Sequence, residues 1–192
     1  MKKKDFIIGE IILVAIIILG FIFLKPNTSS ELKTNEDITK MIKSIYKNSK
    51  LELPELETET IDINNSDDLL SYTGLKSNEN VESVIVSLPL MNAIPYNLAV
   101  VKVKDGANIE TMKEEMLNNI NMRRWVCVNA DKLYITNNGN VIFLIMANEE
   151  DAKPIYEEFK KYVNNNIGKE LEKTYEEEDI ELPDEILKDV NE

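Results

Sequence analysis

The longest apolar run in the chain extends from Phe6 to Leu24, and Glu10 is the one charged residue within it. At about 1.5 Å per residue, a helix of this length rises roughly 28 Å, close to the thickness of a bilayer's hydrocarbon core. Three lysines precede the run, and neither a small-residue cleavage site nor a lipidation cysteine follows it. The pattern therefore predicts that residues 1–25 are an uncleaved signal anchor, with residues 6–24 spanning the bilayer as a transmembrane helix.

The lysines before this run are packed together, whereas those after it are dispersed among acidic residues. This asymmetry predicts a single-pass protein of the cell membrane with its N-terminus in the cytoplasm and its C-terminal domain outside the cell. A type IV pilin-like leader is the second interpretation, because Phe6 and Glu10 follow a basic start. Asp5 in place of the usual glycine, and Pro26 ending the helix early, weaken that interpretation.

After a polar linker over residues 26–35, apolar positions recur every three or four residues in several segments. This period predicts helices over about 36–48, 67–72, 108–122 and 149–168. Thr34 or Asn35 can cap the first of these helices, and Gly74 ends the second. The four predicted segments each have one apolar face, which is expected to pack on a sheet.

Strand patterns occur at Val84–Leu88, Asn97–Val103, Leu133–Thr136 and Val141–Ala147. The last of these is apolar at every position, which predicts a strand buried on both faces in the middle of the sheet. An Asn-Gly turn joins the last two strands. Residues 51–63 contain Pro54 and are interpreted as an extended edge segment.

The order of these elements predicts an α+β fold over residues 36–168. We expect a four-stranded, mainly antiparallel sheet, made of two ββα units, with helices packed on it. From residue 169 to 192 the sequence is acidic with few apolar positions, so this tail is expected to be disordered or loosely docked.

Composition removes several kinds of chemistry from consideration. There is no histidine, and Cys127 is the single cysteine, so His-based catalysis, internal disulfides and thiolate metal cages are excluded. Cys127 lies between valines, which predicts a buried and inert thiol. P-loop and dinucleotide patterns are missing as well, so we expect neither a cofactor nor a metal.

The chain has a net charge of −13, and residues 26–192 alone contain 18 basic and 33 acidic residues, a net of −15. A surface this acidic repels nucleic acid and anionic lipid headgroups, so nucleic-acid partners are not expected.

One loop stands out as a candidate contact site. Between two predicted strands, the segment from Pro89 to Pro95 contains the apolar residues Leu90, Met91 and Ile94. At a hairpin tip these side chains either form an exposed patch for a partner or fold back onto the domain. Further along, Arg123 and Arg124 follow a predicted helix and precede Trp125, on which either guanidinium could stack.

The order of elements also resembles a known family. The segments that carry the resemblance are LSYTGL at residues 70–75, NLAVVKVKD at 97–105, and GNVI at 139–142 leading into VIFLIMANEEDA. Over about residues 36–165 the chain resembles domain-of-unknown-function family 4358, an extracytoplasmic domain of Gram-positive, clostridia-like bacteria. The resemblance implies an anchored envelope domain without known catalytic residues. This chain departs from the lipoprotein members in having a helical anchor.

The sequence therefore predicts a membrane-anchored, non-catalytic extracytoplasmic domain, not an enzyme, that contacts the cell wall or another envelope protein. Its expected partners are the lipid bilayer, through residues 6–24, and that second molecule. Besides the pilin-like subunit, a carboxylate-based envelope hydrolase is an alternative, and it requires two carboxylates facing each other in one cleft. A calcium-dependent adhesin built on the acidic tail is a further alternative.

Overall fold

The computed structural model of the chain describes residues 32–175. Along the chain the elements are α2 (Asn35–Ser49), β1 (Leu56–Thr60), α3 (Ser66–Thr73), β2 (Val81–Pro89), β3 (Tyr96–Val103), α4 (Ile109–Asn119), β4 (Lys132–Asn138), β5 (Val141–Ala147), α5 (Glu149–Tyr162) and β6 (Leu171–Thr174). The predicted anchor over 1–25 lies outside the described residues, as do most of the linker and residues 176–192. Within 32–175, the structure has no helix that is both long and apolar enough to cross a membrane.

The sheet has six strands, not the four that the sequence predicts. All neighbouring strands pair antiparallel in the order β1-β2-β3-β5-β4-β6. The two strands missing from the prediction are the edges, β1 and β6. The sequence predicts an extended edge segment at β1 and a disordered or loosely docked tail at β6. Both strands are short, and each contains one apolar residue, Leu56 in β1 and Leu171 in β6, so neither has the repeated apolar positions that mark a half-buried strand.

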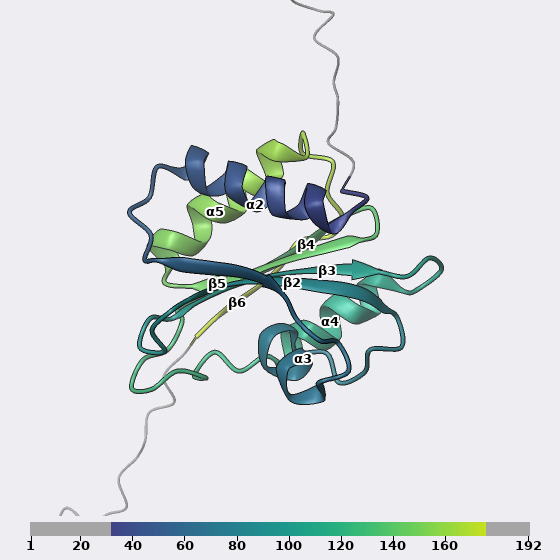
Figure 1. The fold of residues 1–192 in the computed structure, drawn as a ribbon, viewed down its shortest axis with the longest axis horizontal. Helices are drawn as coiled ribbons and strands as arrows, with labels where there is room; N and C mark the ends of the chain where they lie inside the picture. The colour runs from purple at the N-terminus through teal and green to yellow at the C-terminus, as the bar shows by residue number, and fades with distance from the viewer. Residues whose placement is uncertain (1–31, 176–192) are drawn as a thin grey trace, which may run out of the picture. The chain divides into compact units, whose positions relative to one another are not determined.

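Helices cover both faces of this sheet. In Figure 1, α2 and α5 lie on one face and α3 and α4 on the other. The α+β class is thus present, but with this wider sheet in place of two ββα units alone. A sheet covered in this way has two separate cores, one on each face.

The strand β5 contributes to both cores. Phe143 and Ile145 belong to the core under α2 and α5, whereas Ile142, Leu144 and Met146 belong to the core over α3 and α4. All seven residues of β5 are buried. The predicted central position of this strand is confirmed, since β3 and β4 flank it.

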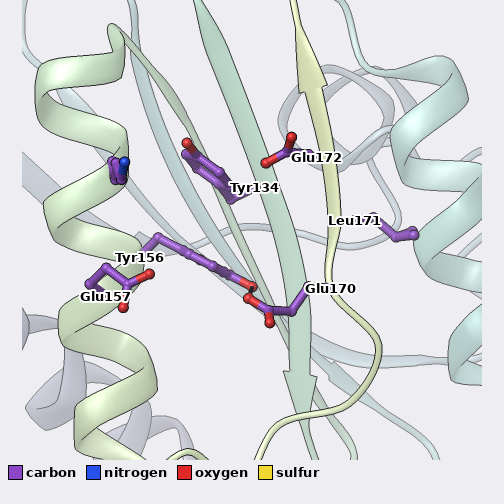
Figure 2. A pocket seen from close by; sticks show the side chains of 7 residues that line it. Tyr134, Tyr156, Glu157, Glu170, Leu171 and Glu172 are labelled. Carbon is purple, nitrogen blue, oxygen red and sulfur yellow. Dashed lines mark hydrogen bonds between the residues drawn. The ribbon is translucent and has the colours of Figure 1, made fainter.

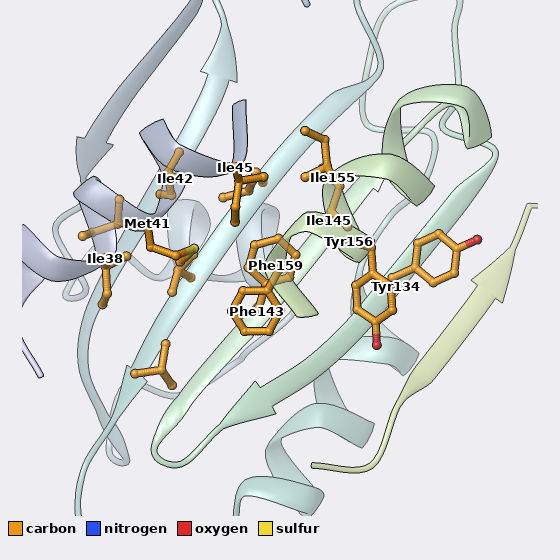
Figure 3. Close-up of a cluster of buried hydrophobic side chains, with 14 of the residues drawn as sticks. Ile38, Met41, Ile42, Ile45, Tyr134, Phe143, Ile145, Ile155, Tyr156 and Phe159 are labelled. Atoms are coloured by element: carbon orange, nitrogen blue, oxygen red, sulfur yellow. The ribbon is translucent and has the colours of Figure 1, made fainter. Parts of the chain in front are cut away.

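The core under α2 and α5 follows the apolar stripes of the two helices, as Figure 3 shows. From α2 the residues Ile38, Met41, Ile42 and Ile45 are buried. From α5, Phe159 stacks on Phe143 with ring centroids 4.1 Å apart. Thr34 caps α2 in a capping box with Asp37, one of the two caps that the sequence predicts.

The helices α4 and α5 end earlier than predicted. The α4 helix ends at Asn119 and α5 at Tyr162, although the apolar period continues to Ile120 and Ile167. After α5, Asn164 and Asn165 adopt positive φ angles, which turn the chain out of the helix. The freed segment leads to β6, and Gly168 donates its N–H to the Asn137 carbonyl, 2.8 Å away.

Candidate interaction surface

The predicted contact loop lies between β2 and β3, and the structure divides its three apolar residues. Leu90 and Met91 are 59% and 64% exposed. Ile94 instead is half-buried and packs against the core under α2 and α5. Leu90 and Met91 therefore remain available for a contact, and Ile94 secures the loop to the domain.

A second loop adjoins the first one. The N–H of Val126 donates to the carbonyl of Asn92 over 3.5 Å, which brings the α4–β4 loop against the β2–β3 loop. The side chain of Val126 is 64% exposed. We call Leu90, Met91 and Val126 together the loop patch. Among residues 32–175, four large hydrophobic side chains are exposed, and three of them form this patch.

The α4–β4 loop is fixed by Arg124, which is half-buried. Its guanidinium donates to the Ser71 carbonyl and to Asn97 Oδ1, both at 3.2 Å. It also lies over the ring of Tyr72, 4.4 Å from the ring centroid, and more distantly over Trp125 at 5.6 Å. The predicted stacking of an arginine on Trp125 is therefore present, but the closer ring is Tyr72.

Several further contacts hold Arg124 and the α4–β4 loop in place. Asn97 is fully buried and also donates its amide to the Tyr72 carbonyl over 3.0 Å, so one side chain joins α3, β3 and Arg124. Burial lowers the pKa of Arg124 from its ordinary value, and the neighbouring Tyr72 opposes that shift. Met122 accepts the N–H of Ala130 across the loop at 2.9 Å. The backbone under Val126 is thus held from both sides.

The prediction of a buried Cys127 is wrong. The thiol is exposed, and the residue has a φ of 62°, which turns the chain between Val126 and Val128. The apolar string from Trp125 to Val128 resembled a buried strand in sequence. Because the segment is a loop, its residues differ in burial: Trp125 lies in the core over α3 and α4 and is 7% exposed, whereas Val128 is half-buried against the same core.

A second candidate site is the pocket between α5 and β6, with a volume of ≈ 390 Å³. Figure 2 shows Tyr156 reaching from α5 toward Glu170, which immediately precedes β6. The Tyr156 hydroxyl donates to Glu170 Oε2 over 2.7 Å, and the Tyr134 ring stacks on Tyr156 with centroids 4.9 Å apart. The sequence did not indicate this pocket, because one wall is the unpredicted strand β6.

Two carboxylates of this pocket share one cation. Lys160 Nζ lies 3.3 Å from Glu157 and 3.2 Å from Glu170. The hydrogen bond from Tyr156 and the nearby Lys160 lower the pKa of Glu170. Burial and the bond to Glu170 raise the pKa of Tyr156 above its ordinary value. The general acid of a glycosidase needs a raised carboxyl pKa so that it keeps its proton. The lowered pKa of Glu170 favours the ionised carboxylate instead, which does not suit that role.

No group of three or more Cys, Asp or Glu side chains within residues 32–175 is placed to hold a metal ion. No family model matches this chain, nor does any curated protein or any solved structure. The resemblance to domain-of-unknown-function family 4358 stays a prediction.

Proposed function

We propose that this chain is a membrane-anchored, non-catalytic domain outside the cytoplasm that binds another envelope protein through the loop patch. The observation that supports the binding role is the gathering of Leu90, Met91 and Val126 on two adjoining loops. Single exposed hydrophobic side chains are ordinary on a protein surface, whereas a group of them on a fixed framework is typical of contact sites.

The energetics of the patch agree with this role. Burying one such side chain against a partner stabilises a complex by about 1.5–3 kcal/mol. The contacts of Arg124 hold the α4–β4 loop in place before any partner arrives, which lowers the entropy lost on binding. The patch therefore has both apolar area and a fixed backbone.

The location of the domain is supported by the sequence alone. The apolar run over residues 6–24 is long enough to span a bilayer, and the packed lysines before it favour a cytoplasmic N-terminus. The domain that follows would then meet proteins of the envelope. Its acidic composition opposes binding to nucleic acid or to anionic lipids.

Photo-crosslinking in intact cells tests the binding role. A benzophenone amino acid replaces Met91 in the patch, and in the control it replaces Lys47, an exposed residue on α2. We expect a discrete adduct of higher mass with the probe at 91 and not with the probe at 47. Val126→Glu should weaken that adduct at least tenfold, because it places a charge in the contact.

Protease treatment of the same intact cells tests the location. We expect residues 26–192 to be degraded from outside while a cytoplasmic marker stays intact. A protected domain would contradict the proposed orientation, and equal adducts at positions 91 and 47 would contradict the role of the patch.

A further inference from the structure

The described residues end at Tyr175, beside the α4–β4 loop, and the C-terminal segment, residues 176–192, follows it in the sequence. The last described residue, Tyr175, donates its N–H to the Asp131 carbonyl over 2.9 Å, and its side chain packs against the core over α3 and α4. Asp131 ends the loop that contains Val126. The segment therefore begins at the end of the sheet where the loop patch lies.

A basic groove adjoins this starting point. It has a volume of ≈ 420 Å³ and is lined by residues 120–123 on one side and 173–175 on the other. The groove thus includes two cations, Arg123 and Lys173. The Arg123 side chain is exposed, and its guanidinium has no ion-pair partner within residues 32–175.

The sequence of the segment is complementary to this surface. It begins with four acidic residues, 176–179, and continues with the apolar residues Ile180, Leu182, Ile186 and Leu187. It contains nine acidic residues and one lysine. Along the segment, the acidic residues come before the apolar ones. The surface has the same order when it is followed from Tyr175: the groove with Arg123 comes first, and the loop patch follows.

The number of residues along the chain allows the C-terminal segment to reach the loop patch. Val126 precedes Asp131 by five residues, and Ile180 follows Tyr175 by five residues. At a maximum of about 3.4 Å per residue, each stretch spans at most roughly 17 Å from the bond between Tyr175 and Asp131. The apolar residues from Ile180 to Leu187 therefore reach every position that Val126 can occupy, and Met91 adjoins Val126 through Asn92.

We propose that residues 176–192 dock on their own domain, with the acidic residues 176–179 against Arg123 and Lys173, and Ile180 and Leu182 on the loop patch. Docking removes exposed apolar area from water at both the segment and the patch. This docking proposal does not depend on the proposed function. If an envelope protein also binds the patch, the segment and that protein compete for one surface.

Disulfide trapping in the full chain, held in detergent micelles, tests the docking. Cys127 is the single cysteine, is exposed and adjoins Val126, so Leu182→Cys creates one defined pair. We measure the rate at which a mild oxidant closes the disulfide within one chain. Replacing residues 176–179 with their amides should slow closure about fivefold, as the loss of two exposed ion pairs implies.

Matched variants in the Leu182→Cys chain separate docking from chance encounters. Arg123→Gln and about 0.5 M salt should each slow closure, because both weaken the charge pairing. Lys76→Gln removes an exposed positive charge elsewhere and should leave the rate unchanged. The fluorescence of Trp125 checks that each variant stays folded.

Two results would overturn the proposal. One is a closure rate that neither the amide replacements, Arg123→Gln nor salt changes. The other is a disulfide that forms only between two chains, which would assign the segment to a second copy. Neither result affects the adduct expected at position 91 in cells, so failure here is distinct from failure of the proposed function.

Discussion

At the scale of single residues, backbone conformation and close approach decide which positions tolerate change. Gly74 ends α3 with a φ of +81°, and an added Cβ would lie 2.6 Å from the Met116 carbonyl oxygen of α4. Gly106 has a φ of +83°, but an added Cβ there would meet nothing within 4 Å. A substituted side chain would be strained by the backbone conformation at both positions, and only at position 74 would it also clash with neighbouring backbone atoms.

We predict that Gly74→Ala lowers the free energy of unfolding by about 3 kcal/mol or more, whereas Gly106→Ala lowers it by about 1 kcal/mol. The difference measures how closely α3 approaches α4. Urea unfolding followed by circular dichroism gives both values. Equal losses in the two variants would show that the α3–α4 approach is looser than the structure indicates.

At the scale of elements, the strand β6 depends on contacts that reach it from α4 and α5. Lys113 of α4 is fully buried, and its ammonium donates to Asn137 Oδ1 and to the Lys169 carbonyl, both at 2.7 Å. Glu110 pairs with the same ammonium at 2.8 Å. One side chain therefore joins α4, the end of β4 and the segment that leads into β6.

We predict that Lys113→Met destabilises the domain by about 2–4 kcal/mol, because it leaves two oxygens near the core without a donor. Amide hydrogens of β6 should exchange faster than in the wild type, which hydrogen exchange with mass spectrometry detects. Lys43→Met, an exposed change on α2, should stay within about 0.5 kcal/mol of the wild type. Unchanged exchange in β6 would contradict the role given to Lys113.

At the scale of the folded domain, the two cores share the central strands. Phe143 packs under α5, and Leu144, the next residue of β5, packs on the opposite face. Trp125, the single tryptophan, belongs to the core over α3 and α4. Its fluorescence therefore reports on one core, while a change at Phe143 acts on the other.

We predict that Phe143→Ala lowers stability by about 3–5 kcal/mol and that the domain still unfolds in one transition. The urea midpoint of Trp125 fluorescence should fall as far as that of circular dichroism. The reason is that β5 contributes to both cores, so unfolding of one core displaces the strand from the other core as well. Leu144→Ala provides the comparison from the other face, with a loss of about 2–5 kcal/mol. A Trp125 midpoint unaffected by Phe143→Ala would show that the cores unfold separately.

The sequence by itself determined the elements whose signals are local and strong. The period predicts the apolar stripe of α2, and side-chain chemistry predicts the turn before Val141 and a cap at either Thr34 or Asn35, of which the structure has Thr34. Full apolarity predicts the central place of β5. The sequence also indicated Leu90, Met91 and Ile94 as a candidate contact site, although the exposure of Leu90 and Met91 is known only from the structure. Each of these features depends on residues that are close together along the chain.

Only the tertiary structure decided the rest of the sheet and the candidate sites. Strands β1 and β6 are stabilised by pairing with distant strands, as in the register of Leu133 with Lys173, which no short window of sequence contains. Val126 joins the loop patch, and Cys127 is exposed, because Arg124 is held by α3 and β3. The physical reason is that edge pairing and loop anchoring arise between residues far apart in sequence.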